Sequence, residues 1–487
     1  MKGFVKLIAV VVTAAAFAVS CSKDKDSGAV SFDKPAVFID APSGMATVGF
    51  TLRNIKTLSV TSQPTGWDEP MLDQTTGMLT VIAPSATALE EGTAVESGTV
   101  VLAGVTPGGT SVSGVLFVGV VKTVDLSAAG VANSYMASVK ETNYLFDVMH
   151  KGDGSPLATD HLGVIWKSAS GLVQYLQMED GKASFYIGAD SDDATKIKQG
   201  NAVIGAYNAD DELIWSWHIW ATDYDPDAEG GTVVFNDYTL MNRNLGAQAN
   251  DNSTTDKILA SYGLYYQWGR KDPFIGPNTY QGSEGSGAPM YSGSGSRVYL
   301  KMTESSAETG TMEYAIRNPL VFITGVADTD NDWLWSGRSD GLWSADDNVA
   351  DKSVNDPCPY GWRVAPSGAF ADLRIVGTPA VGDEAKYGWT LTDGSAESFF
   401  LGAGRRRYDN GKILNIYNPL PKVRSDAMEA QPWEGLYWTT AVSDDNMQAA
   451  ALHFWFEKLD TSAGIDDSAP YARANGLQVR CVKQQGK

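Results

Sequence analysis

The sequence predicts a mainly β protein in which one or more β-sandwich modules precede an irregular, tryptophan-rich C-terminal domain. The chain has 487 residues, too long for one core, since domains average about 100 to 200 residues. Its first part consists of short runs of alternating apolar and polar residues, separated by turns rich in Gly, Pro, Ser and Thr. Its last part places most of the tryptophans among long Gly/Ser/Asn segments, such as residues 276–297. We therefore expect several β-rich units in series.

The first residues are expected to form a secretory signal. Lys2 and Lys6 flank the start of an apolar stretch over 7–19, which is too short and wrongly flanked to span a bilayer. The run Ala18-Val-Ser-Cys21 follows and resembles the cleavage site of bacterial lipoproteins, in which the cysteine is lipidated. The resemblance implies a signal over 1–21 and an outer-membrane, surface-displayed protein that is lipid-anchored at Cys21 without spanning the membrane. An ordinary signal peptide with a chance cysteine is the alternative.

Residues 22–29 are short and polar, and we interpret them as a tether that resembles the surface-export signals of Bacteroidota lipoproteins. The formal net charge of −21 is spread along the chain and argues against nucleic acid as a partner, because a polyanion is repelled.

Cys358 and Cys481 remain once Cys21 is assigned to lipid, and an exported chain with two further cysteines favours a disulfide between them. Two free buried thiols are the alternative.

Residues 30–123 are predicted to form the first β-sandwich. Strand-like runs cover 46–52, 77–82 and 98–102, and a turn is expected at Thr106-Pro-Gly-Gly-Thr110. The style of this block resembles the immunoglobulin-like or BACON-type modules that follow the lipid anchor in Bacteroidota surface proteins. We expect it to act as a spacer.

Residues 124–240 are predicted to form a second β-rich module. Strand-like segments cover 144–148, 162–166, 183–187, 200–206 and 213–220. Trp215, Trp217 and Trp220 are too dense to face solvent throughout, so alternation is expected to bury one set against another sheet. We interpret His218 in this run as a hydrogen-bonded core or interface residue rather than a catalyst.

A series of motifs from about residue 125 onward resembles the fimbrillin-type lipoproteins of Bacteroidales. The motifs are Leu126-Ser-Ala-Ala-Gly130, Trp215-Ser-Trp-His-Ile-Trp220, Met241-Asn-Arg-Asn-Leu-Gly-Ala247 and Gly263-Leu-Tyr-Tyr-Gln-Trp-Gly-Arg-Lys-Asp-Pro-Phe274. Further on, Asn355-Asp-Pro-Cys-Pro-Tyr-Gly-Trp-Arg-Val364, Gly435-Leu-Tyr-Trp-Thr439 and Gly476-Leu-Gln-Val-Arg-Cys-Val482 resemble the Fibrobacter succinogenes major paralogous domain. That resemblance implies an α+β, C-type-lectin-like domain over 241–487.

The resemblance implies an adhesin or a fimbrial subunit, including one at a pilus tip, that binds a glycan or a host or microbial surface protein and other pilus subunits. A glycan-capture lipoprotein of a polysaccharide-uptake system is the alternative. An enzyme is not expected, because the sequence has no His-Glu-x-x-His or Cys-x-x-Cys motif. No nucleotide cofactor is expected either, since Gly402-Ala-Gly404 lacks the third glycine of a dinucleotide fingerprint.

Two runs of alternating aspartates and a group of three tryptophans are the candidate sites for calcium and for sugar. The aspartates at 328, 330 and 332, and at 223, 225 and 227, alternate as calcium ligands do, but Trp333 and Ala228 stand where an EF-hand has glycine. A calcium site therefore stays open, with no metal ligand assigned. Trp333, Trp335 and Trp343 lie in a loop-like polar stretch and are candidates to stack on sugar rings. The alternative, core packing of at least two of the three, is the one that we favour.

Overall fold

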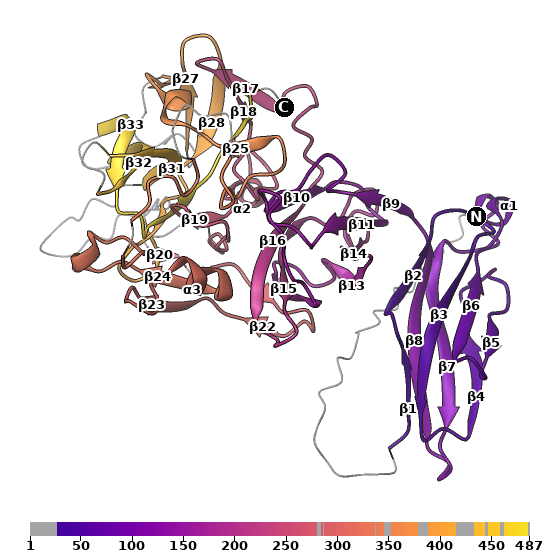
Figure 1. The fold of residues 1–487 in the computed structure, drawn as a ribbon. Helices are drawn as coiled ribbons and strands as arrows, with labels where there is room; N and C mark the ends of the chain where they lie inside the picture. Colours follow the sequence, from indigo (N-terminus) through magenta and orange to yellow (C-terminus); the bar gives the residue numbers. More distant parts are fainter. Residues whose placement is uncertain are drawn as a thin grey trace, which may run out of the picture.

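The computed structural model describes residues 27–279, 284–285, 287–336, 338–344, 352–377, 388–414, 433–443, 447–457 and 462–485. These residues form mainly β-strands, as predicted (Figure 1). The helices among them are short: α1 (Ala86–Glu90), α2 (Thr255–Ser261), α3 (Met312–Arg317) and the 3-10 helices η1 (Ala327–Thr329) and η2 (Ser367–Phe370). No helix in the described ranges is long and apolar enough to cross a membrane.

The first unit is a two-sheet sandwich, as the alternating pattern predicts. One sheet has the order β1-β3-β6-β5 and the other β2-β8-β7-β4, with β2 parallel to β8. The inward positions of both sheets, such as Val48, Leu79, Leu102 and Leu116, form a separate core. Its strands are β1 (Ala29–Phe32), β2 (Ala36–Ile39), β3 (Met45–Arg53), β4 (Thr57–Ser62), β5 (Met71–Asp73), β6 (Met78–Ile82), β7 (Ser97–Val105) and β8 (Ser111–Val120).

The second unit also packs two sheets. One has the order β13-β14-β11-β9 and the other β10-β16-β15-β12-β21-β22. The first of these sheets lies beside the sandwich, to which β9 connects it directly (Figure 1). The bounds are β9 (Lys122–Asp125), β10 (Ser134–Ala137), β11 (Thr142–Asp147), β12 (His161–Lys167), β13 (Gln174–Glu179), β14 (Lys182–Ile187), β15 (Gly200–Tyr207), β16 (Leu213–Ala221), β21 (Met290–Tyr291) and β22 (Arg297–Val298).

Strand β16 is buried on both faces. The sequence analysis expected burial of only one face, with one set of its tryptophans. Trp215 and Trp217 point into the core of the second unit, whereas Trp220 points into the core of the C-terminal unit. His218 shares the face of Trp220 and is buried, as expected. Its ring is within hydrogen-bond distance of Ser134 Oγ, 3.0 Å from Nδ1, and of Asn201 Oδ1, 2.9 Å from Nε2. One strand therefore contributes to two cores.

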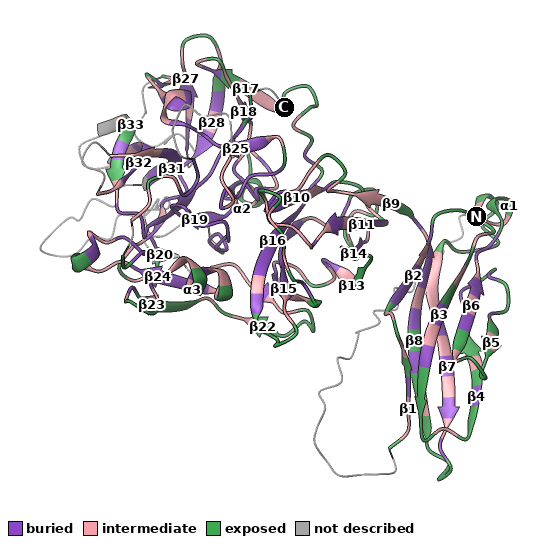
Figure 2. Ribbon diagram, viewed as in Figure 1, coloured by how far each residue is buried: buried purple, intermediate pink, exposed green. Residues whose placement is uncertain are grey.

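The C-terminal unit is built around an eight-stranded sheet of order β20-β30-β29-β34-β31-β32-β33, with β19 also paired to β34. Three smaller sheets surround it: β17-β18-β35-β25, β26-β27-β28 and β23-β24. Figure 2 shows that most strands here are buried, in contrast to the more exposed sandwich. The bounds are β17 (Thr232–Phe235), β18 (Tyr238–Met241), β19 (Tyr265–Gln267), β20 (Glu284–Gly285), β23 (Lys301–Glu304), β24 (Val321–Thr324), β25 (Trp362–Val364), β26 (Arg374–Ile375), β27 (Gly388–Thr392), β28 (Glu397–Leu401), β29 (Arg405–Arg406), β30 (Ile413–Leu414), β31 (Trp433–Val442), β32 (Ala449–Glu457), β33 (Ser462–Tyr471), β34 (Gly476–Gln478) and β35 (Cys481–Lys483).

Strand pairings cross the boundary that the sequence analysis places between residues 240 and 241. The boundary falls inside β18, and Leu240 of this strand pairs with Val482 of β35 near the other end of the chain. In the opposite direction, Tyr291 of β21 pairs with Lys167 of β12 and so joins the sheet of the second unit. The second and C-terminal units therefore share strands.

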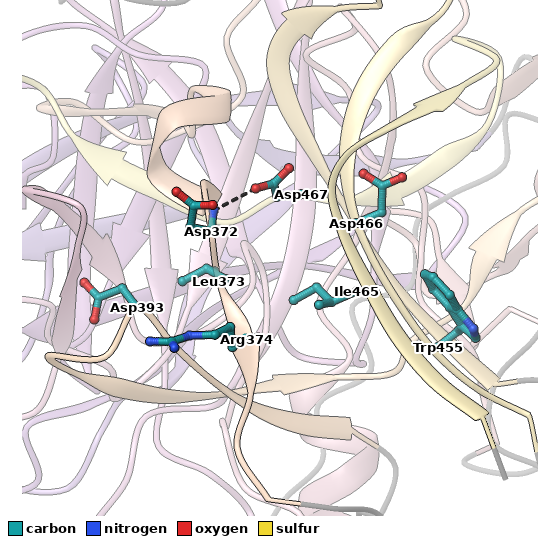
Figure 3. A pocket seen from close by; sticks show the side chains of 8 residues that line it. All are labelled: Asp372, Leu373, Arg374, Asp393, Trp455, Ile465, Asp466 and Asp467. Atoms are coloured by element: carbon teal, nitrogen blue, oxygen red, sulfur yellow. Dashed lines mark hydrogen bonds between the residues drawn. The ribbon is translucent and has the colours of Figure 1, made fainter.

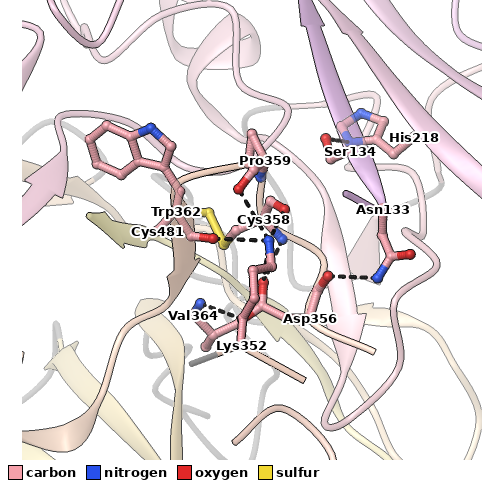
Figure 4. Close-up of a disulfide and its surroundings, with 10 residues drawn as sticks. All are labelled: Asn133, Ser134, His218, Lys352, Asp356, Cys358, Pro359, Trp362, Val364 and Cys481. Carbon is pink, nitrogen blue, oxygen red and sulfur yellow. Dashed lines mark hydrogen bonds and ion pairs between the residues drawn. A yellow bond between two sulfur atoms is a disulfide. The ribbon is translucent and has the colours of Figure 1, made fainter. Parts of the chain in front are cut away.

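The predicted disulfide between Cys358 and Cys481 is confirmed, and it ties β35 to the turn before β25 (Figure 4). Lys352 secures this turn by donating hydrogen bonds to the carbonyl groups of Cys358 at 2.5 Å and Trp362 at 2.9 Å. Asp356 lies 3.5 Å from the Lys352 ammonium group and accepts the Cys358 backbone N–H at 2.8 Å. Burial raises the pKa of Asp356, while the nearby ammonium group favours its carboxylate form.

Candidate functional site

The candidate site is a shallow cleft of about 650 Å³ at the outer edge of the eight-stranded sheet, which we call the edge cleft (Figure 3). One wall comes from the turn after η2, from β26 and from the turn between β27 and β28. The other wall comes from β32 and the edge strand β33. The lining residues are Asp372, Leu373, Arg374, Asp393, Trp455, Ile465, Asp466 and Asp467.

The indole of Trp455 lies across β33 because the residue opposite it is a glycine. Trp455 on β32 pairs with Gly464 on β33. A Cβ atom at residue 464 would lie 2.1 Å from Trp455 Cζ2, so any other residue there would displace the ring. The side chain is half-buried and keeps part of its surface toward the edge cleft. An aromatic ring over an edge-strand glycine is a known way of stabilising such a strand pair.

A chain of polar contacts supports the indole from behind. The His453 ring packs against Trp455, with ring centroids 4.8 Å apart. His453 Nε2 lies 3.1 Å from Glu434 Oε2, and the other oxygen of Glu434 lies 3.5 Å from Arg405 Nε. The Arg405 guanidinium group in turn lies over the ring of Tyr471, 5.3 Å from its centroid. These contacts restrict the rotamer of Trp455, which lowers the entropic cost of using it as a binding surface.

The carboxylates of the edge cleft are held in place by backbone amides. Asp467 Oδ2 accepts the backbone N–H of Asp372 at 2.7 Å, which joins the two walls (Figure 3). Asp466 Oδ1 accepts the N–H of Ser468 at 3.0 Å. Hydrogen bonds from the Ser395 hydroxyl and from neighbouring backbone amides hold the pKa of Asp393 well below its usual range. Asp393 therefore stays ionised.

The edge cleft combines fixed acceptors with one apolar surface. Ionised carboxylates accept several hydrogen bonds each, and hydroxyl groups of a ligand are suitable donors. Arg374 adds a donor, because its guanidinium group makes no hydrogen bond or ion pair with any residue that the structure describes. The indole offers an apolar face on which a ring with C–H groups can lie. A ligand with hydroxyl groups on its edge and C–H groups on its face fits this combination.

The tryptophans that the sequence analysis selected do not form a common surface. Trp333 and Trp343 are fully buried, and their indole N–H groups donate to the backbone carbonyls of Trp268 at 2.8 Å and Arg270 at 3.2 Å. Their candidacy as sugar-stacking residues is thus wrong, and the core-packing alternative is confirmed for these two. Trp335 has 38% of its surface exposed and remains accessible, but it lies outside the edge cleft.

The remaining sequence candidates have different outcomes. Cys21 lies outside the described residues, so its lipidation stays a prediction. Asp332 is buried within ion-pair distance of Arg338, with Asp332 Oδ2 3.6 Å from Arg338 Nε. Asp225 Oδ1 accepts the N–H of Asp227 at 2.9 Å within a turn. In the described ranges, no three His, Cys, Asp or Glu side chains are grouped to hold a metal ion.

The comparisons with known proteins assign no family. No family model matches the chain. No curated protein matches it either. Among solved structures, SGBP-B of the mixed-linkage glucan utilization locus of Bacteroides ovatus, in complex with a mixed-linkage heptasaccharide, is 9% identical with a TM-score of 0.12, over 39% of this chain and 43% of that one. The adhesin InvE of Yersinia pseudotuberculosis is 14% identical with a TM-score of 0.14, over 46% of this chain and 68% of that one.

The mouse protocadherin PcdhgC3 EC1-3 has a similar score, with 14% identity and a TM-score of 0.15 over 40% of this chain and 68% of that one. The match to the glucan-locus protein spans less than half of that protein's length. Structural similarities with such low TM-scores give no information about the ligand or the role of this chain.

Sequence reasoning missed the edge cleft because its residues come from four separate segments between 372 and 467. The signal that was present is the tryptophan at 455 in an alternating strand and the glycine at 464 beyond it. Their pairing depends on the register of β32 against β33, which the sequence pattern does not specify.

Proposed function

We propose that this protein is an extracellular, non-enzymatic binding protein that holds a glycan in the edge cleft, in the manner of an adhesin or a glycan-capture lipoprotein. The observation that carries the proposal is the half-buried Trp455, held over Gly464 and bordered by carboxylates that backbone amides fix in place. The buried disulfide supports an oxidising, extracellular location, because such bonds persist there.

The finer parts of the proposal rest on sequence motifs. These are the lipid anchor on Cys21, the C-type-lectin-like nature of residues 241–487 and the fimbrial role with pilus subunits as partners. A spacer role for the sandwich is supported by its own core and by its distance from β32 and β33, the strands that line one wall of the edge cleft (Figure 1). An adhesin of this kind works by contact and requires no cofactor.

The proposal predicts that Trp455→Ala weakens glycan binding by about tenfold or more, because the variant loses the apolar surface on which the sugar ring lies. The measurement is a glycan-array screen of the purified chain, followed by calorimetric titration with the strongest ligand. Gly464→Val should have a similar effect, since its side chain displaces the indole.

Trp335→Ala is the matched control, because it removes an exposed indole of the same unit outside the edge cleft. It should leave the affinity unchanged. Equal affinities of the wild type and Trp455→Ala for every ligand on the array would exclude the edge cleft as the binding site.

A further inference from the structure

A second cleft, of about 460 Å³, lies where the first sandwich meets the second unit, and we call it the junction cleft. Its volume falls within the roughly 300 to 1,000 Å³ that is usual for small-ligand sites, which often lie between domains. The sandwich contributes Lys34, Ala36, Val37, Phe38, Ala46 and Thr47. The second unit contributes Thr123, Asn143, Leu145, Gln177, Glu179, Asp180, Lys182 and Ser184.

Aromatic contacts hold the two walls together. The ring of Phe117 from the sandwich stacks on Tyr175 with centroids 4.4 Å apart, and Phe38 stacks on Tyr186 at 6.1 Å. Tyr175 lies within the register shift of β13 between Gln174 and Gln177, and it has a φ angle of 54°, an unusual value for a residue other than glycine. Lys34 Nζ of the sandwich lies 2.5 Å from Glu179 Oε1 of the second unit. The junction cleft therefore has defined walls on both sides.

The floor of the junction cleft is a directed chain of hydrogen bonds. Ser184 Oγ donates to Asn143 Oδ1 at 2.9 Å, and Asn143 Nδ2 donates to Thr123 Oγ1 at 3.4 Å. Thr123 Oγ1 donates to Asp40 Oδ1 of the sandwich at 2.7 Å. The Ser184 and Asn143 side chains are buried polar groups that line the cleft. Because the Ser184 hydroxyl is already a donor, its lone pairs remain to accept a hydrogen bond from a ligand.

Gln177 supplies a second acceptor that the fold does not use. It lines the cleft next to Ser184, its partner in the β13–β14 pairing. Its Oε1 atom is buried and accepts no hydrogen bond from any described residue. A buried acceptor without a partner costs free energy, so such a group needs an explanation. A donor on a ligand in the junction cleft would satisfy it.

The charges of the junction cleft favour a neutral ligand. Lys34 is paired with Glu179, and Lys182 Nζ lies 2.5 Å from Asp125 Oδ2. Both ammonium groups are thus occupied, and Asp180 adds a further negative charge on the lining, which disfavours an anion. Phe38 supplies apolar surface from the sandwich wall, opposite the acceptors, and Leu145 adds carbon beside Ser184, its partner in the β11–β14 pairing. The site thus offers hydrogen-bond acceptors on one side and carbon on the other.

We propose that the junction cleft binds a neutral, polyhydroxylated ligand, a short segment of an uncharged polysaccharide, between the sandwich and the second unit. Ligand hydroxyl groups donate to Gln177 Oε1 and Ser184 Oγ, and the C–H face of a sugar ring lies against Phe38. The sandwich is then part of a binding site rather than only a spacer. This inference does not rest on the edge cleft.

The test uses the full chain carrying Trp455→Ala, so that the edge cleft is removed from the measurement. Neutral gluco-, manno- and xylo-oligosaccharides are titrated by calorimetry. We expect saturable binding to one series and an affinity about tenfold lower for Gln177→Leu, which removes the unused acceptor. Thr47→Trp, which fills the cleft from the sandwich side, should reduce binding at least as much.

Thr51→Trp is the matched control, because residue 51 lies exposed on the same face of β3 but outside the junction cleft. It should bind as its parent does, and comparing melting curves confirms that all variants fold. Binding that survives Thr47→Trp, or the absence of binding to all three series, would overturn the proposal. If the wild type binds a glycan and the Trp455→Ala chain does not, the proposal for the junction cleft is overturned, while the proposal for the edge cleft stands.

Discussion

At the scale of single residues, His218 makes the stability of the protein depend on pH. Burial lowers its pKa from the ordinary 6.5 to about 3, and its ring is close to the neutral partners Ser134 and Asn201. The folded state therefore holds a neutral imidazole, while the unfolded chain takes up a proton below pH 6.5. The stability that His218 contributes is present above pH 6.5 and is lost as the pH falls toward 3, by about 1.4 kcal/mol per pH unit.

We predict that His218→Gln has a flatter stability profile over this window than the wild type. Urea unfolding at several pH values between 7 and 4, roughly the range over which the unfolded histidine titrates, measures the difference. Carboxylates that titrate over the same range affect both proteins, so they cancel in the comparison. Parallel profiles would show that the fold accommodates the imidazolium.

Residue types favoured core packing for at least two of Trp333, Trp335 and Trp343 without identifying which two, and a core or interface position for His218; the structure buries Trp333, Trp343 and His218. Residue types did not predict Trp455 as the accessible indole. Its exposure depends on a glycine on the neighbouring strand and on the register between β32 and β33. Such cross-strand information is absent from a local pattern.

At the scale of elements, β16 couples two parts of the molecule. The sequence pattern predicted the strand, but burial of both its faces depends on sheet partners that are distant in sequence. Trp217→Ala leaves a cavity in the core of the second unit and Trp220→Ala leaves one in the C-terminal core, each at a cost of about 3 to 5 kcal/mol. Because both residues belong to one strand, we predict that both variants lower the same calorimetric transition.

Trp67→Ala is the control for this prediction, since Trp67 belongs to the core of the sandwich. It should lower a different transition. Two separate transitions, one affected by Trp217→Ala and the other by Trp220→Ala, would show that the second and C-terminal units unfold independently.

At the scale of the whole molecule, the sequence pattern predicted the order of the β-rich units better than their limits. Strands β1 to β8 of the sandwich pair only with one another and enclose their own core, but the predicted limit at 123/124 falls inside β9, which pairs with β11 of the second unit. The limit at 240/241 also falls within a strand, β18, whose partner β35 lies more than two hundred residues away. A pairing between strands so far apart cannot be predicted from the local sequence pattern. The disulfide that secures β35 could be predicted, because only two cysteines remain once Cys21 is assigned to lipid.

That disulfide should stabilise the C-terminal unit and leave the sandwich unaffected. It closes a loop of 123 residues, which contributes about 4 to 5 kcal/mol if the cross-link acts on the entropy of the unfolded chain. Replacing Cys358 and Cys481 together by alanine should lower the C-terminal transition by about 10 °C, at roughly 2 to 4 °C per kcal/mol, and leave the sandwich transition in place. Differential scanning calorimetry measures both transitions in one experiment. If both transitions shift, the sandwich unfolds together with the rest of the chain. If neither transition shifts, the β25–β35 pairing and the Lys352 contacts hold the C-terminal strand without the covalent link.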